Sequence, residues 1–236
     1  MIIFIDIETT GLESLDRICS IAVIAVDGKD IISKYDLVNE GKKVSPKASS
    51  VNHITNEMIK DKPKLKDSET FKFLEKNNNR DTTIIAHNVK FDLKMLLTCG
   101  FEWHGNIIDT LRVTKHLILE CEEFSLQFLR YELKLYKNEM KEALKCGISD
   151  DLSAHNAMSD SLHVKLLYEY LLEIKPHVEL IELSFKNVLM QKLEFGKYSG
   201  RYIEEISMCD RGYLEWMLGN IMDLDEDLRY SIEYNL

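Results

Sequence analysis

The chain has 236 residues, of which 45% are hydrophobic and 30% are charged, and its formal net charge is −10. This length allows one full-sized domain and a small additional unit. The negative charge excludes broad, nonspecific binding to duplex nucleic acid, which needs many lysine and arginine contacts to phosphate, but it allows a small footprint whose acids are neutralised by metal ions.

No apolar run approaches the roughly eighteen residues that cross a bilayer, and the amino terminus enters a strand without a basic leader. The five cysteines are widely spaced and form no Cys-x-x-Cys pair, which argues against a disulfide framework or a zinc ribbon. We therefore expect a cytoplasmic protein with no membrane partner.

Residues 2–8 form an apolar, β-branched run that a Thr-Thr-Gly turn ends, which predicts a buried strand. Asp6 and Glu8 lie two apart, so both carboxylates face the same side. About 4 Å apart at an effective dielectric near 20, they would repel by about 4 kcal/mol, so we expect a cation between them. Oxygen ligands favour Mg²⁺ or Mn²⁺ over zinc. The alternative is a pair of solvated acids beside a turn.

Strands are predicted at residues 18–26 and 31–38, joined by a hairpin at Asp27-Gly28. The elements that follow are a loop around Pro46, helices from Thr55 and over 68–76, a strand at 82–86, a helix at 89–98 ended by Gly100, and a strand from 107. A helical pattern covers 110–174, with Ser125 and Ser159 as helix starts. The predicted fold class is α/β, a mixed sheet flanked by helices.

The likeliest break between two domains lies at Lys175-Pro176, because proline disfavours helix at the preceding residue. We therefore predict one domain over residues 1–175 and a small α+β module over 183–236. In the module, residues 188–206 are predicted to form a hairpin, followed by helices near 213–218 and 226–234.

Three further polar residues fall beside predicted helix starts. Asp92 lies in the first turn of the helix that follows a strand end. His155 and Asp160 are five residues apart, so on one helix they would be turned by about 140° from each other. We expect His155 on the loop before the helix and Asp160 in its first turn. An imidazole on a mobile approach suits a general base for water.

These motifs together resemble the DEDDh exonucleases of the RNase H-like superfamily, over about residues 1–173. The matching segments are Asp6-x-Glu8-Thr-Thr-Gly-Leu, Val51-Asn52-His53-Ile54-Thr55, His87-Asn88-x-x-Phe91-Asp92 and His155-x-Ala157-x-x-Asp160. The sister branch carries tyrosine four residues before the last aspartate, where this chain has Asn156, so the histidine branch is indicated.

The resemblance implies a 3′–5′ exonuclease that hydrolyses phosphodiester bonds at the 3′ end of DNA, preferring single-stranded or frayed ends, and releases nucleoside 5′-monophosphates. Two divalent ions, Mg²⁺ or Mn²⁺, would be held by Asp6, Glu8, Asp92 and Asp160. His155 would be the general base. Four carboxylates and two such ions make a neutral pocket for the phosphate.

The resemblance also assigns substrate contacts on the loops around this site. They are Thr9, Thr10, Gly11, Leu12, His53, Asn88 and Phe91. For Leu12 and Phe91 the alternative is core packing. The family usually places glycine after the histidine, where this chain has Ile54, so a buried structural histidine is the alternative for His53.

The tail, residues 193–206 and 210–218, resembles the carboxy-terminal module of exodeoxyribonuclease X-like proteins. Cations beside aromatic rings suit base stacking and phosphate contact. The candidate nucleic-acid contacts are Lys197, Tyr198 and Arg201. The alternative is that Phe195, Tyr213 and Trp216 form a small core and the charges are only solvated.

We expect single-stranded DNA 3′ ends as the partner, with a DNA polymerase or repair proteins as further partners in replication, proofreading or repair. Two alternatives stay open. One is an RNA-directed exoribonuclease of the same fold, because the choice depends on how the pocket treats the 2′-hydroxyl. The other is a non-catalytic, polymerase-associated nucleic-acid-binding subunit, against which the presence of all five catalytic positions argues.

Overall fold

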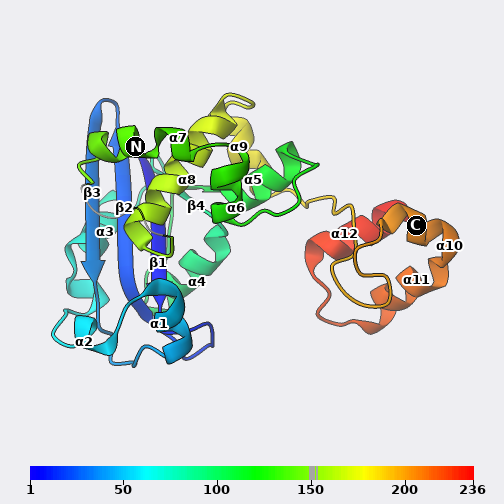
Figure 1. Cartoon of the computed structure of the whole chain (residues 1–236), viewed down its shortest axis with the longest axis horizontal. Coiled ribbons are helices and arrows are strands. Elements are labelled where there is room, and N and C mark those ends of the chain that lie inside the picture. The colour runs from blue at the N-terminus through cyan, green and yellow to red at the C-terminus, as the bar shows by residue number, and fades with distance from the viewer. Residues whose placement is uncertain (149–151, 153) are drawn as a thin grey trace. The chain divides into compact units, whose positions relative to one another are not determined.

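The structure, a computed structural model, describes residues 1–148, 152 and 154–236 (Figure 1). Residues 149–151 and 153, within the predicted helical stretch, lie outside the described residues. The chain divides into two compact units, Met1–Ser184 and Phe185–Leu236. Among the described residues, no helix is both long enough and apolar enough to cross a membrane.

The first unit is built on a five-stranded sheet in the order β3-β2-β1-β4-β5. The strands are β1 (Ile2–Thr9), β2 (Ile18–Asp27), β3 (Asp30–Leu37), β4 (Thr83–Ala86) and β5 (Asn106–Asp109). The central β1 pairs antiparallel with β2 and parallel with β4. The predicted hairpin is present, with Gly28 at φ 61° in its turn. The mixed sheet predicted from the sequence is therefore confirmed.

Apolar side chains of β1 alternate between the two faces of the sheet, and this alternation decides where its acids point. Ile3, Ile5 and Ile7 pack in the core beneath α3 (Glu69–Asn77) and α4 (Val89–Thr98). Phe4 packs on the other face. The helices of that face are α5 (Thr110–Leu117), α6 (Leu126–Glu132), α7 (Tyr136–Lys145) and α8 (Ala157–Leu172). Even-numbered β1 residues therefore face α8.

Two helices begin differently from the prediction. The predicted loop around Pro46 is the helix α1 (Pro46–Asn52), because proline is favourable at a first helical position and the Ser45 side chain accepts from the Ala48 amide. α8 begins after Asn156, not at Ser159, because the Asn156 side chain accepts from the first free amides. Thr55, Ser68 and Ser125 do cap the helices α2 (Asn56–Ile59), α3 and α6.

The first unit extends past the predicted boundary at residue 175. The helix α8 ends at Leu172, and Pro176 is the N-cap of a further helix, α9 (His177–Leu183). Leu180 of α9 is fully buried in the core beneath α8. The His177 ring nitrogens lie 2.8 Å from the Tyr168 hydroxyl and 3.1 Å from the Thr83 hydroxyl. These contacts tie α9 to both α8 and β4.

The second unit contains α10 (Ile203–Cys209), α11 (Arg211–Asn220) and α12 (Glu226–Asn235). The predicted hairpin is reduced to one isolated bridge between Lys192 and Tyr202. The buried core is aliphatic, and of the three aromatic residues in the alternative Tyr213 packs against it. The core consists of Leu193, Ile203, Ile206, Leu214, Met217, Leu224, Leu228 and Ile232. Phe195 and Trp216 are 45% and 52% exposed.

Two glycines of the second unit provide a test of its packing. Gly196 and Gly200 both have positive φ, 79° and 84°. A Cβ at Gly196 would lie 2.4 Å from the Tyr213 hydroxyl oxygen, whereas a Cβ at Gly200 meets nothing within 4 Å. We expect Gly200→Ala to cost about 1–2 kcal/mol from backbone strain. Gly196→Ala should reduce the free energy of unfolding by more than this. The measurement is hydrogen exchange over residues 193–217, which should be faster in Gly196→Ala than in Gly200→Ala. Equal effects of the two substitutions would contradict the packing at Tyr213.

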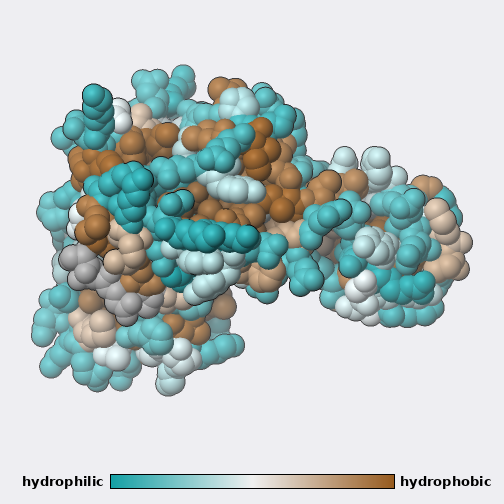
Figure 2. Space-filling model, turned by 45° about the horizontal axis from the view of Figure 1, so that its top comes forward, coloured by the Kyte–Doolittle hydropathy of each residue, from teal (hydrophilic) through white to brown (hydrophobic). Residues whose placement is uncertain are grey.

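The surface of the described chain has mixed polarity. The face in Figure 2 is covered mainly by hydrophilic side chains, with apolar patches between them. Single exposed apolar side chains are normal on globular proteins. All five cysteines are free thiols, as predicted from their spacing.

Candidate active site

Three carboxylates meet at the end of the central strand. One oxygen each from Asp6, Glu8 and Asp160 lies within 4.8 Å of the other two. Asp6 and Glu8 come from the β1 face that α8 covers, and Asp160 lies in the first turn of α8. The alternation of β1 and the cap at Asn156 thus bring together acids that lie more than 150 residues apart in the sequence.

The β1–β2 ladder changes register where β1 leaves this group. Glu8 pairs with Ser20, and Thr9 pairs with Ile18, so Cys19 is an extra residue on β2. An extra residue of this kind increases the local twist and can redirect side chains, which is why such irregularities occur near active sites. The bulge therefore ends regular pairing directly after Glu8.

The electrostatics of these acids call for a cation. Burial raises the pKa of Asp6 well above its ordinary value, and the charges of Asp160, Asp92 and Glu8 raise it further. Burial, followed by the charge of Asp160, raises the pKa of Glu8 to about 8, against an opposing hydrogen bond from Asn52. Ionising the group without a counter-charge is unfavourable. Clustered carboxylate oxygens are also the ligands that hard divalent ions prefer.

Asp92 approaches the same end of the sheet from the opposite face. It lies in the first turn of α4, as predicted, and is 4% exposed. Burial raises the pKa of Asp92 well above its ordinary value, and the charges of Asp109 and Glu8 raise it further. Hydrogen bonds from the backbone amides of Asp92 and Ile7 lower this pKa in part. Asp92 interacts electrostatically with Asp6 and Glu8, but it is not one of the three closely grouped acids.

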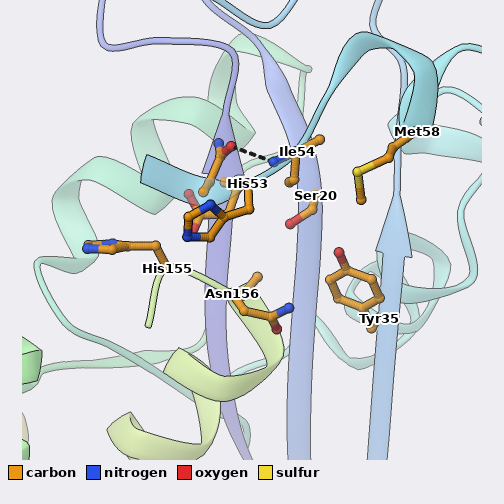
Figure 3. A pocket seen from close by; sticks show the side chains of 10 residues that line it. Ser20, Tyr35, His53, Ile54, Met58, His155 and Asn156 are labelled. Carbon is orange, nitrogen blue, oxygen red and sulfur yellow. Dashed lines mark hydrogen bonds between the residues drawn. The ribbon is translucent and has the colours of Figure 1, made fainter. Parts of the chain in front are cut away.

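His155 lies on the turn before α8, as predicted, with φ 56°. It is exposed and lines a pocket of about 100 Å³ together with Glu8 and His53. Its imidazole points away from Ser20 on β2 and Tyr35 on β3 (Figure 3). The side chain can therefore reach a molecule that approaches the acids from solvent.

The turn after β1 is held by its own side chains. The Thr9 hydroxyl donates to the Gly11 carbonyl at 2.6 Å, and the buried Thr10 hydroxyl donates to Asp16 at 2.8 Å. A Cβ at Gly11 would lie 2.4 Å from the Asp16 carboxylate, so any larger residue there would have to displace Asp16. Leu12 is 83% exposed, so the core-packing alternative for Leu12 is wrong. Sequence reasoning missed Asp16, which a turn rich in polar residues could have indicated.

Asn52 and His53 are neighbours in the chain, but Asn52 is buried and His53 is exposed. His53 is exposed in the left-handed conformation at φ 59°, so the buried alternative for it is wrong. Asn52 is buried, donates to the Thr9 carbonyl at 3.1 Å and accepts from the Ile54 amide at 3.0 Å. Its hydrogen bond to Glu8 lowers the pKa of that acid. Asn52 was overlooked because histidine next to it has the more conspicuous chemistry.

Asn88 and Phe91 flank the site on the side of β4 and α4. Asn88 is exposed at φ 70°, and its backbone amide donates to the buried Asp109 carboxylate at 3.0 Å. Phe91 is half-buried and packs against the core, so it is accessible only in part. Asp109 also caps α5 through the amide of Leu111. Its position at a strand end before a helix was the available signal.

The three tail candidates lie together in the second unit. The Lys197 ammonium is 2.9 Å from Asp210 and 4.6 Å from the Tyr198 ring centre. The Tyr198 hydroxyl donates to Asp210 at 2.8 Å, and the Arg201 guanidinium lies 5.6 Å from the same ring. All three therefore have partners within the unit, since Arg201 also lies 3.9 Å from Glu205, and more than half of the Lys197 and Arg201 side chains is exposed.

Residues 3–168 match the family described as Exonuclease, and residues 193–222 match the family described as Exodeoxyribonuclease X-like C-terminal. The first match covers well over half of the chain. The chain belongs to the exonuclease family. The resemblance noted from its motifs is thereby confirmed.

Two relatives show how far this similarity extends. Exodeoxyribonuclease 10 of Escherichia coli is 26% identical over 240 residues, covering 100% of this chain and 99% of that protein. The PolC-type DNA polymerase III of Thermotoga maritima is 32% identical over 142 residues, which cover 56% of this chain and only 10% of that protein. The first relative thus matches this exonuclease along both units.

Solved structures share the fold. Exonuclease X in complex with 5′-overhanging duplex DNA has a TM-score of 0.60 at 22% identity, over 78% of this chain and 99% of that one. Escherichia coli exonuclease I in complex with an oligonucleotide has a TM-score of 0.53 at 20% identity, over 77% of this chain and 42% of that one. The predicted RNase H-like sheet is confirmed. Exonucleases of this family depend on divalent metal ions and act on nucleic acid.

The raised pKa of Glu8 predicts how the stability of the metal-free protein changes with pH. The folded state keeps the Glu8 proton up to about pH 8, whereas the unfolded chain releases it near the ordinary value of 4.5. The stabilisation is therefore complete below the unfolded pKa and is lost as pH rises through the folded one. In chelator, we expect Tm to fall as the pH rises from 4.5 to about 8. The fall should be smaller for Glu8→Gln. A Tm that rises over this window would contradict the assignment.

Proposed function

We propose that this exonuclease removes nucleotides one at a time from the 3′ end of DNA, preferably single-stranded or frayed, and releases nucleoside 5′-monophosphates. The observation that carries the proposal is the meeting of Asp6, Glu8 and Asp160 within 4.8 Å at the end of β1, with the exposed His155 beside the same pocket. Asp160 is buried and Asp6 and Glu8 are half-buried, so three acids that repel one another at this point have no structural use that neutral side chains would not serve better.

Asp6, Glu8 and Asp160 would hold one divalent ion, Mg²⁺ or Mn²⁺, and Asp6 with Asp92 would hold a second. When bound, such ions supply positive charge that stabilises the attacking and leaving oxygens of an in-line displacement. Because the pKa values of Asp6 and Glu8 are raised, binding of cations would release protons from these acids. The carboxylate oxygens suit Mg²⁺ or Mn²⁺. Histidine and cysteine, which would favour zinc, do not belong to the three-acid group.

His155 is proposed to take the proton of the attacking water. A new bond forms between the water oxygen and the terminal phosphorus, and the bond to the 3′ oxygen of the preceding nucleotide breaks. That oxygen then takes a proton from solvent, and His155 returns its proton to solvent. The exposed position of His155 on a turn allows both transfers.

The loops around the acids are proposed to hold the strand end. Leu12 projects into solvent from the Asp16-braced turn and can stack against the terminal base. Because the Thr10 hydroxyl is buried and already bonded, contacts from Thr10 and Gly11 would come from their backbone. His53, exposed on the pocket, is proposed to contact the terminal nucleotide. Thr9, Asn88 and Phe91 would line the path of the strand.

DNA is proposed as the substrate because the relative that matches both units is named an exodeoxyribonuclease and the matching exonuclease X structure contains duplex DNA with an overhang. The partial match to PolC-type DNA polymerase III supports a role in replication or repair, in the company of polymerase or repair proteins. We propose that residues 1–184 form the catalytic domain and that Arg201, with Lys197 and Tyr198, contacts nucleic acid from the second unit.

The test uses a 5′-labelled single-stranded oligonucleotide with Mg²⁺ or Mn²⁺. We expect a ladder of products shortened from the 3′ end, release of 5′-monophosphates, and complete inhibition by chelator. A phosphorothioate bond at the 3′ end should slow the reaction, whereas one at the 5′ end should not. Faster digestion of a matched RNA would identify an exoribonuclease instead. Tight binding without products would identify a non-catalytic subunit.

A further inference from the structure

Asp160 is one member of a ring of neighbouring polar side chains. Gln127 Nε2 donates to Asp160 Oδ1 at 2.8 Å, and Arg130 Nη1 donates to Gln127 Oε1 at 3.2 Å. Arg130 Nε and Nη2 each donate to Glu139 at 2.8 Å. His163 lies between the two ends of this series: Nδ1 is 3.4 Å from Asp160 Oδ1, and Nε2 is 3.4 Å from Glu139 Oε2 without forming a hydrogen bond.

This ring is partly buried and joins three helices. The His163 side chain is fully buried, and the Arg130 and Glu139 side chains are 11% and 14% exposed. Gln127 and Arg130 belong to α6, Glu139 to α7, and His163 to α8, one turn after Asp160. A two-point bond between arginine and carboxylate fixes the orientation of both groups, and buried networks hold their members more firmly than isolated bonds do.

We propose that Gln127 and Arg130 are positioning residues that set the divalent-metal affinity of Asp160. The contacts of Gln127 and His163 with Asp160 both use Oδ1, so Oδ2 would be the oxygen offered to a cation held with Asp6 and Glu8. Carboxylates that bind metals are themselves oriented by hydrogen bonds of this kind. The inference rests on the proposed function, because it requires Asp160 to bind metal.

A second ion pair, between α7 and α8, provides a matched control. Lys165 of α8 is 2.6 Å from Glu142 of α7, and their side chains are 4% and 9% exposed. This pair also contacts Lys145 and Glu169, but it has no recorded contact with the ring. It therefore contributes to α7–α8 packing without acting on Asp160.

The experiment titrates Mn²⁺ into the full chain by electron paramagnetic resonance and measures Tm for each variant in chelator. We expect Gln127→Leu and Arg130→Gln to weaken Mn²⁺ binding by about 10- to 100-fold. Arg130→Lys, which keeps the charge without the two-point bond, should fall between these variants and wild type. Glu142→Gln should lower Tm and leave Mn²⁺ binding unchanged.

Wild-type Mn²⁺ binding in folded Gln127→Leu and Arg130→Gln would overturn the inference. Equal weakening by Glu142→Gln would also overturn it, because the effect would then come from packing alone. If the wild-type protein fails to bind Mn²⁺, or if Asp160→Asn binds it equally well, the proposed function itself fails, and that outcome is distinct from the first two.

Discussion

Replacing Asp160 by asparagine should reduce exonuclease activity by about 10³-fold or more, because a metal ligand supplies several kcal/mol of transition-state stabilisation and each 1.4 kcal/mol is a factor of ten. The same substitution should raise Tm in chelator. Asp160 is the charge that most raises the pKa of Asp6 and Glu8 after burial, so removing it relieves repulsion in the metal-free site. Asparagine keeps the oxygen that accepts from Gln127.

The measurement combines 3′-end digestion with thermal unfolding, each with and without Mn²⁺. Asp30→Asn is the control, since Asp30 is an exposed acid at the start of β3 and should change neither quantity. Wild-type digestion by Asp160→Asn would disprove the site. A lower Tm for Asp160→Asn in chelator would show that the acids are not held together against their repulsion.

Replacing His155 by alanine should lower kcat by about 10²- to 10⁴-fold, the usual contribution of a general base. Mn²⁺ binding should be unchanged, because His155 is exposed on the turn before α8 and does not belong to the three-acid group. Single-turnover digestion at saturating DNA separates the loss in chemistry from any loss in binding. Added imidazole should restore part of the rate.

His53 provides the matched control for this substitution, as the other exposed histidine of the same pocket. His53→Ala should raise KM and change kcat little, because His53 is proposed to contact the nucleotide and not the water. If His155→Ala weakens Mn²⁺ binding as much as it slows digestion, His155 is a ligand and not the base. Equal kcat losses for both variants would also contradict the assignment.

The first strand shows what sequence could predict. Its alternation of apolar residues with Asp6 and Glu8 is local, so the face of both acids followed from the strand period alone. Asp160 joins them across the whole domain, and no local pattern links the two segments. Its place came from the resemblance and from the predicted helix start at Ser159, which put it in a first turn, although the helix begins after Asn156. The roles assigned to these residues stay predictions.

The wrong predictions of secondary structure at Pro46 and in the tail also have local causes. Pro46 was interpreted as a loop residue, although the first position of a helix tolerates proline well. In the tail, the glycines at 196 and 200 suggested a hairpin, yet Ile203 and Ile206 lie three apart and are both fully buried. A strand would point these two side chains to opposite faces, so their shared burial is typical of helix. The spacing was the better signal.

The anchoring of α9 has a practical consequence for anyone who wishes to shorten this protein. A fragment truncated at Lys175 would expose the core residues that Leu180 packs against. It would also lack the His177 imidazole, which joins Tyr168 to Thr83. Cutting one short helix later, after Ser184, keeps both, along with the Ser184 hydroxyl that accepts from the Asp109 amide. The longer fragment should therefore express as a folded nuclease, and the shorter one should aggregate.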